Sequence, residues 1–150
     1  MSQLGDPDLQ LLLRGLHSPL ALDARRWDRV LRLARASGLH ARLAASNLDT
    51  PGLPDVVRRH LSSAARIAAY RAQMLRAELF HLSPLCQGDF PVIVLKGAAY
   101  LLQGRPMATG RFVSDLDLLV PSAHLHTMEA RLRSAGWKPE DLTPYDERYY

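Results

Sequence analysis

The stretch that decides the fold is residues 90–121, FPVIVLKGAAYLLQGRPMATGRFVSDLDLLVP. Residues 92–95 form a short apolar run with β-branched members, which predicts a buried strand. The following Lys-Gly pair predicts a tight turn, and residues 98–102 predict the opening of a helix. After a polar loop, residues 112–120 predict a second strand that pairs with the first. The stretch therefore predicts a small unit of strands and helices.

Two carboxylates, Asp115 and Asp117, lie two residues apart in the second predicted strand. Successive strand side chains point to opposite faces, so both carboxylates are expected on the same face. Their neighbours are apolar, and two carboxylates in such surroundings are unfavourable without a partner cation. Magnesium is bound through one or two carboxylates together with phosphate oxygens of a substrate. The pattern gives the hypothesis of a magnesium–nucleotide site; the structural alternative is that Asp115 caps locally or pairs with Arg111.

The turn before the helix supplies candidate phosphate ligands. A strand–glycine–helix junction at Lys96, Gly97 and Ala98 presents backbone N–H groups, and glycine lets the backbone come close to a ligand. Lys96 adds a mobile positive charge, and the planar guanidinium of Arg111 is suited to gripping two oxygens of a triphosphate. Ser114 either caps locally or contacts phosphate. Neither GxxxxGK[ST] nor GxGxxG occurs in the chain, so the junction is not one of these nucleotide-binding loops.

Composition and length bound the fold. The chain has 150 residues, of which 47% are hydrophobic and 23% charged, as in globular proteins. This length allows a helical subdomain over residues 1–89 followed by a partial α/β core over residues 90–150. The net charge of +4 allows a nucleic-acid partner, but the arginines are spread along the chain, so no basic cluster supports one.

Cysteine usage and the absence of apolar runs predict the setting of the protein. Cys86 is the only cysteine, which excludes an internal disulfide framework and favours a reducing compartment. The first ten residues lack the basic start and apolar centre of a signal peptide. No apolar run approaches membrane-spanning length. We therefore expect a cytoplasmic protein with no membrane partner.

The first half of the chain predicts helices. Short helices are expected over residues 8–17, over residues 23–38 with Asp23 as the cap, and over residues 39–45. A longer helix is expected from residue 54 to about residue 82, ended by Pro84. Its apolar residues recur in alternating steps of four and three, at Leu61, Ala65, Ala68, Ala72, Leu75, Leu79 and Leu82.

That heptad stripe has two interpretations. It could be a dimerisation seam, or it could pack against other helices of the same chain. Its alanines favour close helix–helix contact, so packing within the chain is preferred. A further amphipathic helix is expected over residues 123–135, and either a third strand or an extended arm is expected to begin at Trp137.

Three segments of the chain resemble the uncharacterised nucleotidyltransferases of the DNA polymerase β-like superfamily. They are VIVLKGAAYL at residues 92–101, RxxSDxDLLV at residues 111–120, and LRSAGW at residues 132–137. The N-terminal segment WDRVLRLARASGLHARL is also similar to this family, so the resemblance covers nearly the whole chain. The RxxSDxDLLV segment is its most specific part.

The resemblance implies an α+β fold, in which a small mixed sheet is flanked by helices and preceded by a helical subdomain. It implies that Asp115 and Asp117 are the catalytic residues and the magnesium ligands, with room for a second metal ion. It also implies that the turn at Gly97 holds nucleotide phosphates. The reaction implied is transfer of a nucleoside monophosphate from an NTP to an acceptor hydroxyl on a small molecule, a protein or an RNA.

The chain departs from the superfamily pattern in two places. Relatives carry Gly-Ser where this chain has Gly97-Ala98, which removes one hydroxyl contact. A third carboxylate on a later strand is also expected, and the candidates lie too close to the preceding helix to match it: Glu140, Asp141, Asp146 and Glu147. We therefore expect the chain to end in mid-fold. The alternative is a catalytically degenerate module that binds a nucleotide or a protein without turnover.

Overall fold

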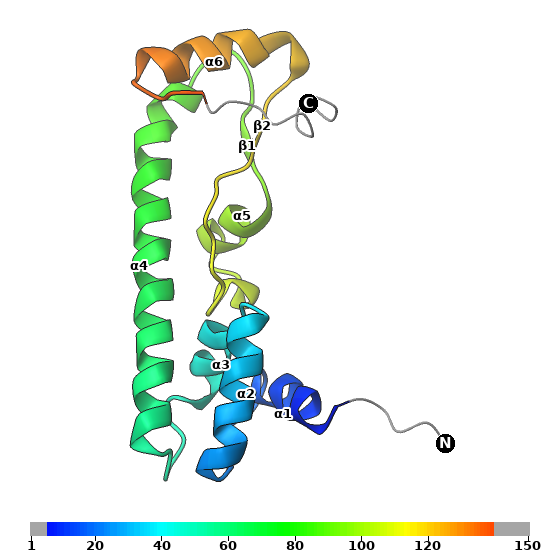
Figure 1. The fold of residues 1–150 in the computed structure, drawn as a ribbon. Coiled ribbons are helices and arrows are strands. Elements are labelled where there is room, and N and C mark those ends of the chain that lie inside the picture. The colour runs from blue at the N-terminus through cyan, green and yellow to red at the C-terminus, as the bar shows by residue number, and fades with distance from the viewer. Residues whose placement is uncertain (1–5, 140–150) are drawn as a thin grey trace, which may run out of the picture.

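The computed structural model describes residues 6–139. Over this range the chain is an α+β fold dominated by helices, as predicted, with one two-stranded sheet. Figure 1 shows one long helix along a side of the molecule, with the shorter elements beside it. In chain order the elements are α1 (Pro7–Gly15), α2 (Ala24–Ala36), α3 (His40–Asn47), α4 (Asp55–Cys86), β1 (Ile93–Val94), α5 (Lys96–Leu102), η1 (Pro106–Ala108), β2 (Leu118–Leu119), η2 (Ser122–His124) and α6 (Leu125–Ser134).

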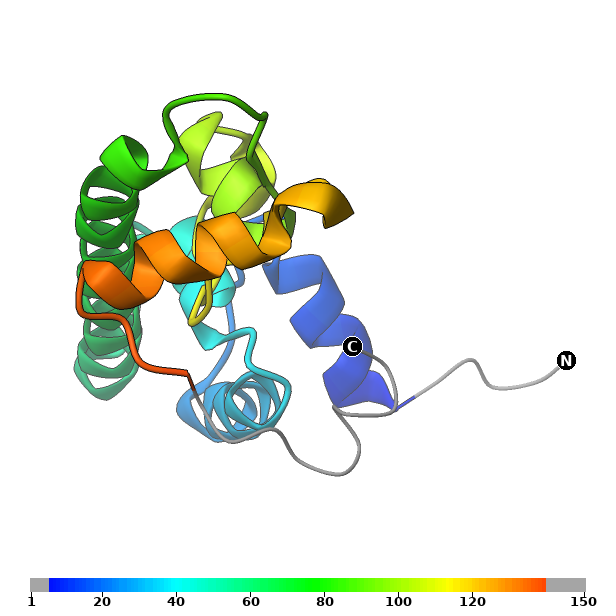
Figure 2. The ribbon, with the colours of Figure 1, turned by 90° about the horizontal axis from the view of Figure 1, so that it is seen from above.

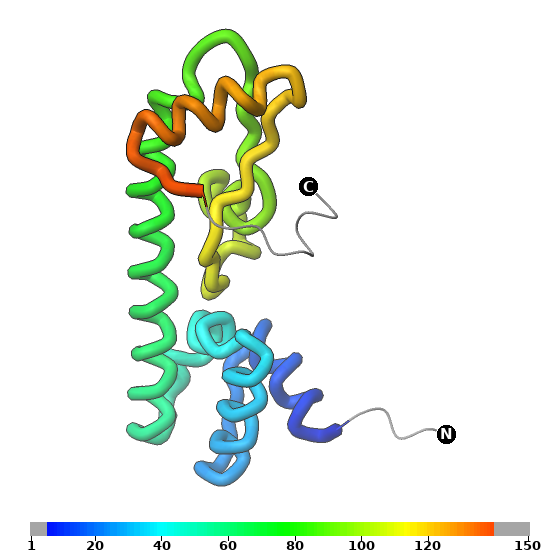
Figure 3. The backbone as a smooth tube through the Cα atoms, turned by 45° about the horizontal axis from the view of Figure 1, so that its top comes forward, coloured from blue at the N-terminus to red at the C-terminus, as the bar shows by residue number. Residues whose placement is uncertain are grey.

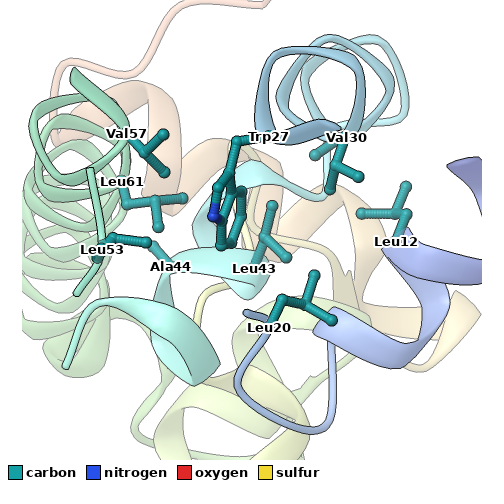
Figure 4. Packing of buried hydrophobic residues seen from close by; sticks show 10 residues of the cluster. Leu12, Leu20, Trp27, Val30, Leu43, Ala44, Leu53, Val57 and Leu61 are labelled. Carbon is teal, nitrogen blue, oxygen red and sulfur yellow. The ribbon is translucent and has the colours of Figure 1, made fainter. Parts of the chain in front are cut away.

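The first three helices pack around Trp27, whose side chain is 1% exposed. The predicted cap of α2 is formed, because the Asp23 carboxylate accepts a hydrogen bond of 2.8 Å from the Arg26 N–H. Leu12 of α1 and Leu43 of α3 complete the core together with side chains from α4 (Figure 4). Burial of these apolar surfaces is the main favourable term for this half of the fold.

Asn47 is the only buried polar residue in the part of the chain that the structure describes, and it ties three segments together. Its Oδ1 accepts a 2.7 Å hydrogen bond from the Leu20 N–H. Its Nδ2 donates to the carbonyls of Gly15 at 2.7 Å and Leu43 at 2.9 Å. A buried amide with these three hydrogen bonds fixes the loop after α1 against α3.

The heptad stripe of α4 packs within the chain, so the preferred interpretation is confirmed. Leu61 joins the core around Trp27, Ala68 joins a small cluster with Ala41, and Leu75 contacts the α/β part of the chain. Helix α4 thus spans the molecule from the helical part to the α/β part (Figure 3).

The prediction that Pro84 ends the long helix is wrong, because α4 continues to Cys86. Proline lacks an N–H and cannot donate to the carbonyl four residues earlier, which belongs to Phe80. Phe80 is 76% exposed, so water can satisfy the bond that Pro84 cannot make. The helix therefore tolerates a proline in its last turn.

The sheet pairs Ile93 with Leu119 and Val94 with Leu118 in antiparallel register. The predicted pairing of the two strands is confirmed, but the second strand is much shorter than the expected residues 112–120. Residues 111–117 have no regular secondary structure. The side chain of Phe112 packs against Ala41, Ala64 and Ala68 instead, which pulls the chain away from β1.

Helix α6 crosses the end of the molecule above the sheet (Figure 2). It begins later than expected, since residues 122–124 form the 3₁₀ turn η2. Arg131 fixes it to α4 by donating to the carbonyls of Leu85 and Gln87, each at 3.3 Å. No strand forms at residues 137–139, and the remainder of the expected third strand lies outside the described residues. In residues 6–139 no helix is long and apolar enough to cross a membrane.

Candidate functional site

The turn between β1 and α5 is made by Lys96, which has a φ of 50°. This left-handed conformation is unfavourable by about 1–2 kcal/mol for a residue with a Cβ. The sequence suggested that glycine would make this turn, yet Gly97 is the second residue of α5 and has no positive φ. Backbone strain is therefore stored at Lys96, one of the predicted phosphate ligands.

Gly97 serves close packing instead. A Cβ at this position would lie 3.1 Å from both methyl groups of Val113 and 3.6 Å from Nε of Arg111. Ala98 is also buried and packs in one cluster with Leu75 and Val113. The glycine thus lets residues 111–113 approach the first turn of α5, which brings Arg111 beside the Lys-Gly pair. No side chain of residues 6–139 caps α5.

Lys96 and Asp117 form an ion pair across the strand pair. Nζ of Lys96 lies 2.9 Å from Oδ1 of Asp117, although the two residues are far apart in sequence. The Asp117 carbonyl also accepts a 2.9 Å hydrogen bond from the Leu95 N–H, so the backbone holds the two side chains close. The Lys96 side chain is 68% exposed and that of Asp117 30% exposed, so water reaches the pair.

Asp115 and Ser114 lie in the irregular segment before β2 and are both exposed. Ser114 Oγ donates to Oδ1 of Asp115 at the long distance of 3.5 Å. The strand on which the same-face expectation rested does not reach Asp115. The structure therefore brings Lys96, Gly97 and Asp117 together by backbone pairing, while Asp115 depends on a segment without ladder hydrogen bonds.

Arg111 stands over the ring of Tyr100, with its guanidinium carbon 6.0 Å from the ring centroid. Among residues 6–139 it forms no salt bridge, so the alternative in which it pairs with Asp115 does not occur in this structure. Its charge remains available to an anion near Gly97.

Two residues of α4 join this region without a signal in the sequence. Arg71 and Glu78 line a hollow of about 290 Å³ together with Val113 and Ser114. The guanidinium of Arg71 lies 5.3 Å from the ring centroid of Phe112. Local sequence could not reveal them, because both occupy ordinary polar positions of a long helix and reach the site only through the packing of α4.

The carboxylates fit a magnesium site in part. Asp115 and Asp117 supply the hard oxygen ligands that magnesium prefers, and phosphate oxygens of a substrate normally complete its shell. Within residues 6–139, no group of three or more His, Cys, Asp or Glu side chains lies close enough together to hold an ion. The four candidates for a third acid, Glu140, Asp141, Asp146 and Glu147, lie outside the described residues.

Comparison with known proteins identifies the family of the chain. No curated protein and no solved structure matches the chain. The family described as "Uncharacterised nucleotidyltransferase" matches residues 23–150, from the cap of α2 to the last residue, and so includes every residue of the candidate site. With most of its length matched, this chain belongs to that family of uncharacterised nucleotidyltransferases.

Proposed function

We propose that the protein is a magnesium-dependent nucleotidyltransferase that moves a nucleoside monophosphate from an NTP to an acceptor hydroxyl. Family membership supports nucleotidyltransferase activity in general. In the proposed reaction the acceptor oxygen forms a bond to the α-phosphorus, and the bond between that phosphorus and the α–β bridging oxygen breaks. Pyrophosphate leaves with the electron pair, and the acceptor proton passes to a base.

The observation that carries the proposal is the contact between Lys96 and Asp117 at 2.9 Å. It joins a candidate phosphate ligand to a candidate metal ligand at the point where Gly97 admits Arg111. The positive charges of Lys96 and Arg111 suit the phosphates of a metal–triphosphate complex, and the carboxylate of Asp117 suits its metal ion.

The ion pair also suits exchange for a ligand. Exposed pairs of this kind contribute only about 0–1 kcal/mol to stability, because water screens both charges. Opening it to transfer Asp117 to a metal ion and Lys96 to a phosphate therefore costs little. Lys96 neutralises the carboxylate until a nucleotide brings its own cation.

We assign the following roles within residues 90–150, with the helices of residues 1–89 as a supporting subdomain. Asp115 and Asp117 would hold magnesium, which supplies charge stabilisation for the leaving pyrophosphate. The phosphates would be bound by Lys96, Gly97, Ala98, Arg111 and Ser114. Their contribution is positioning and charge rather than covalent chemistry.

The test is the thermal stability of the protein with ATP, GTP, CTP and UTP, each with and without Mg²⁺. A nucleotide present at 100 times its dissociation constant should raise the unfolding free energy by about 2.7 kcal/mol. The double variant Asp115→Asn/Asp117→Asn should lose the magnesium-dependent part of this gain. A matched control is Asp89→Asn, because Asp89 is an exposed carboxylate whose ion pair is with Arg131 of α6, at 3.8 Å.

The outcomes distinguish an active nucleotidyltransferase from a module that binds a nucleotide without turnover. A magnesium-dependent gain that is lost in the double variant and kept in Asp89→Asn supports the site. If the same gain occurs but no pyrophosphate is released when a panel of acceptors is added, the chain is the degenerate binding module. No gain with any of the four nucleotides would refute the proposed site.

A further inference from the structure

A pocket of about 440 Å³ lies among α3, α4 and the segment after α5, at the other end of α5 from Lys96. Its floor is made of alanines from the facing sides of α3 and α4, at Ala44, Ala65, Ala68, Ala69 and Ala72. Figure 3 shows the segment between α5 and β2 descending onto α3 alongside α4, where it forms the remaining wall.

That wall is fixed to α3 rather than loosely placed. Nη1 of Arg42 donates to the carbonyls of Pro106 and Thr109, each at 3.0 Å. Gly110 lies against the α3 backbone so closely that a Cβ would be 2.5 Å from the carbonyl oxygen of Ala41. The pocket is therefore preformed, which limits the ordering entropy that a ligand would have to overcome.

Three arginines and one carboxylate surround the alanine floor: Arg76, Arg105, Arg111 and Asp49. In the described range none of these four side chains forms a salt bridge. Nε of Arg105 donates to the amide oxygen of Gln103, at 3.0 Å. Positive charge therefore exceeds negative charge at the pocket, and no carboxylate of residues 6–139 neutralises it.

We propose that this pocket binds a small molecule that has an apolar body and a phosphate or carboxylate group. Guanidinium groups bind such oxyanions through paired, charge-assisted hydrogen bonds. The alanine methyl groups leave room for a flat apolar group between the two helices. The larger apolar hollow between α2 and the start of α4 has no comparable excess of arginines.

This binding site does not depend on the proposed nucleotidyl transfer. Arg76 and Arg105 have no part in the metal or phosphate site, and only Arg111 reaches both regions. The pocket can therefore be tested with variants that leave Lys96, Asp115 and Asp117 unchanged.

The experiment is a ¹H–¹⁵N chemical-shift titration of the whole chain with phenyl phosphate and, separately, with benzoate. We expect saturable shifts of the amides that line the pocket, with the tighter probe showing whether phosphate or carboxylate is preferred. Arg76→Ala should raise the dissociation constant about tenfold or more. Ala69→Leu should abolish binding by filling the pocket; Ala69 is exposed, so this variant should still fold.

Arg66→Ala is the matched control, since Arg66 is an exposed arginine of α4 outside every described pocket. Its removal should leave the dissociation constant within about twofold, because screening weakens distant charges. Equal loss in Arg66→Ala, equally tight binding of inorganic phosphate, or no saturable shift with either probe would overturn the proposal. Asp115→Asn should bind phenyl phosphate normally, so failure of the nucleotide site and failure of the pocket are distinguishable.

Discussion

Replacing Gly97 with alanine tests the contact on which the candidate site is built. The new methyl group would lie 3.1 Å from both Cγ atoms of Val113, which is closer than ordinary van der Waals contact. Either the first turn of α5 or residues 111–113 must move by a few tenths of an ångström. Arg111 is part of the displaced segment, so the change reaches the proposed phosphate ligands.

Two opposing terms set the magnitude. Overpacking of a tight contact typically destabilises by about 1–3 kcal/mol. Alanine is favoured over glycine within a helix by roughly 1 kcal/mol, which offsets part of this loss. We therefore expect Gly97→Ala to lower the unfolding free energy by about 0–2 kcal/mol. Because two opposing effects give this small difference, a second variant is needed to separate them.

A double-mutant cycle with Val113→Ala isolates the contact. Val113 is 9% exposed, so its truncation alone should be destabilising through loss of buried methyl groups. In the double variant the new methyl group occupies the space that valine vacates, and the double loss should fall short of the sum by about 0.5–3 kcal/mol. The assay is urea denaturation, with Ala99→Gly in the same helix as the measure of helix propensity.

One result of the double-mutant cycle would refute the packing role of Gly97. If the effects of Gly97→Ala and Val113→Ala add, the two side chains do not compete for one space. Gly97 would then have no packing role, and the close approach of Arg111 to this turn would lose its explanation.

Three further predictions concern the supports of the fold and one titrating group. Asn47→Ala should lower the unfolding free energy by about 2–3 kcal/mol or more in urea denaturation, because the buried Leu20 N–H loses its acceptor; a loss below 1 kcal/mol would contradict this. Gly110→Ala should destabilise by more than about 3 kcal/mol and shift the amide resonances of α3, since its Cβ would overlap the Ala41 carbonyl oxygen. Burial, and after it the charges of Arg35 and Arg71, lowers the pKa of His40 in the folded protein below its ordinary value of 6.5. As the pH falls below 6.5, the unfolded chain therefore binds more protons than the folded protein does. Stability should therefore decrease below pH 6.5, and His40→Gln should flatten that part of the stability–pH profile; an unchanged profile would exclude His40 as the cause.

The sequence by itself determined the helices and indicated where the two strands lie. Caps such as Asp23 and the four–three spacing of the α4 stripe are local signals, and local hydrogen bonds and periodic burial are sufficient to form those elements. The motif around Asp115 and Asp117 also indicated the family whose match covers residues 23–150. These features depend on neighbours in sequence, so they can be predicted without a structure.

Only the tertiary structure decided how the second predicted strand ends and which residue makes the turn. Phe112 finds its contacts on α3 and α4, so the chain leaves the sheet before Asp115 in spite of its strand-like pattern. Lys96 takes the left-handed conformation, because Gly97 is needed where Val113 packs on α5. Long-range packing outweighs local preference at these positions, since burying a side chain is worth more than the 1–2 kcal/mol or so of backbone strain.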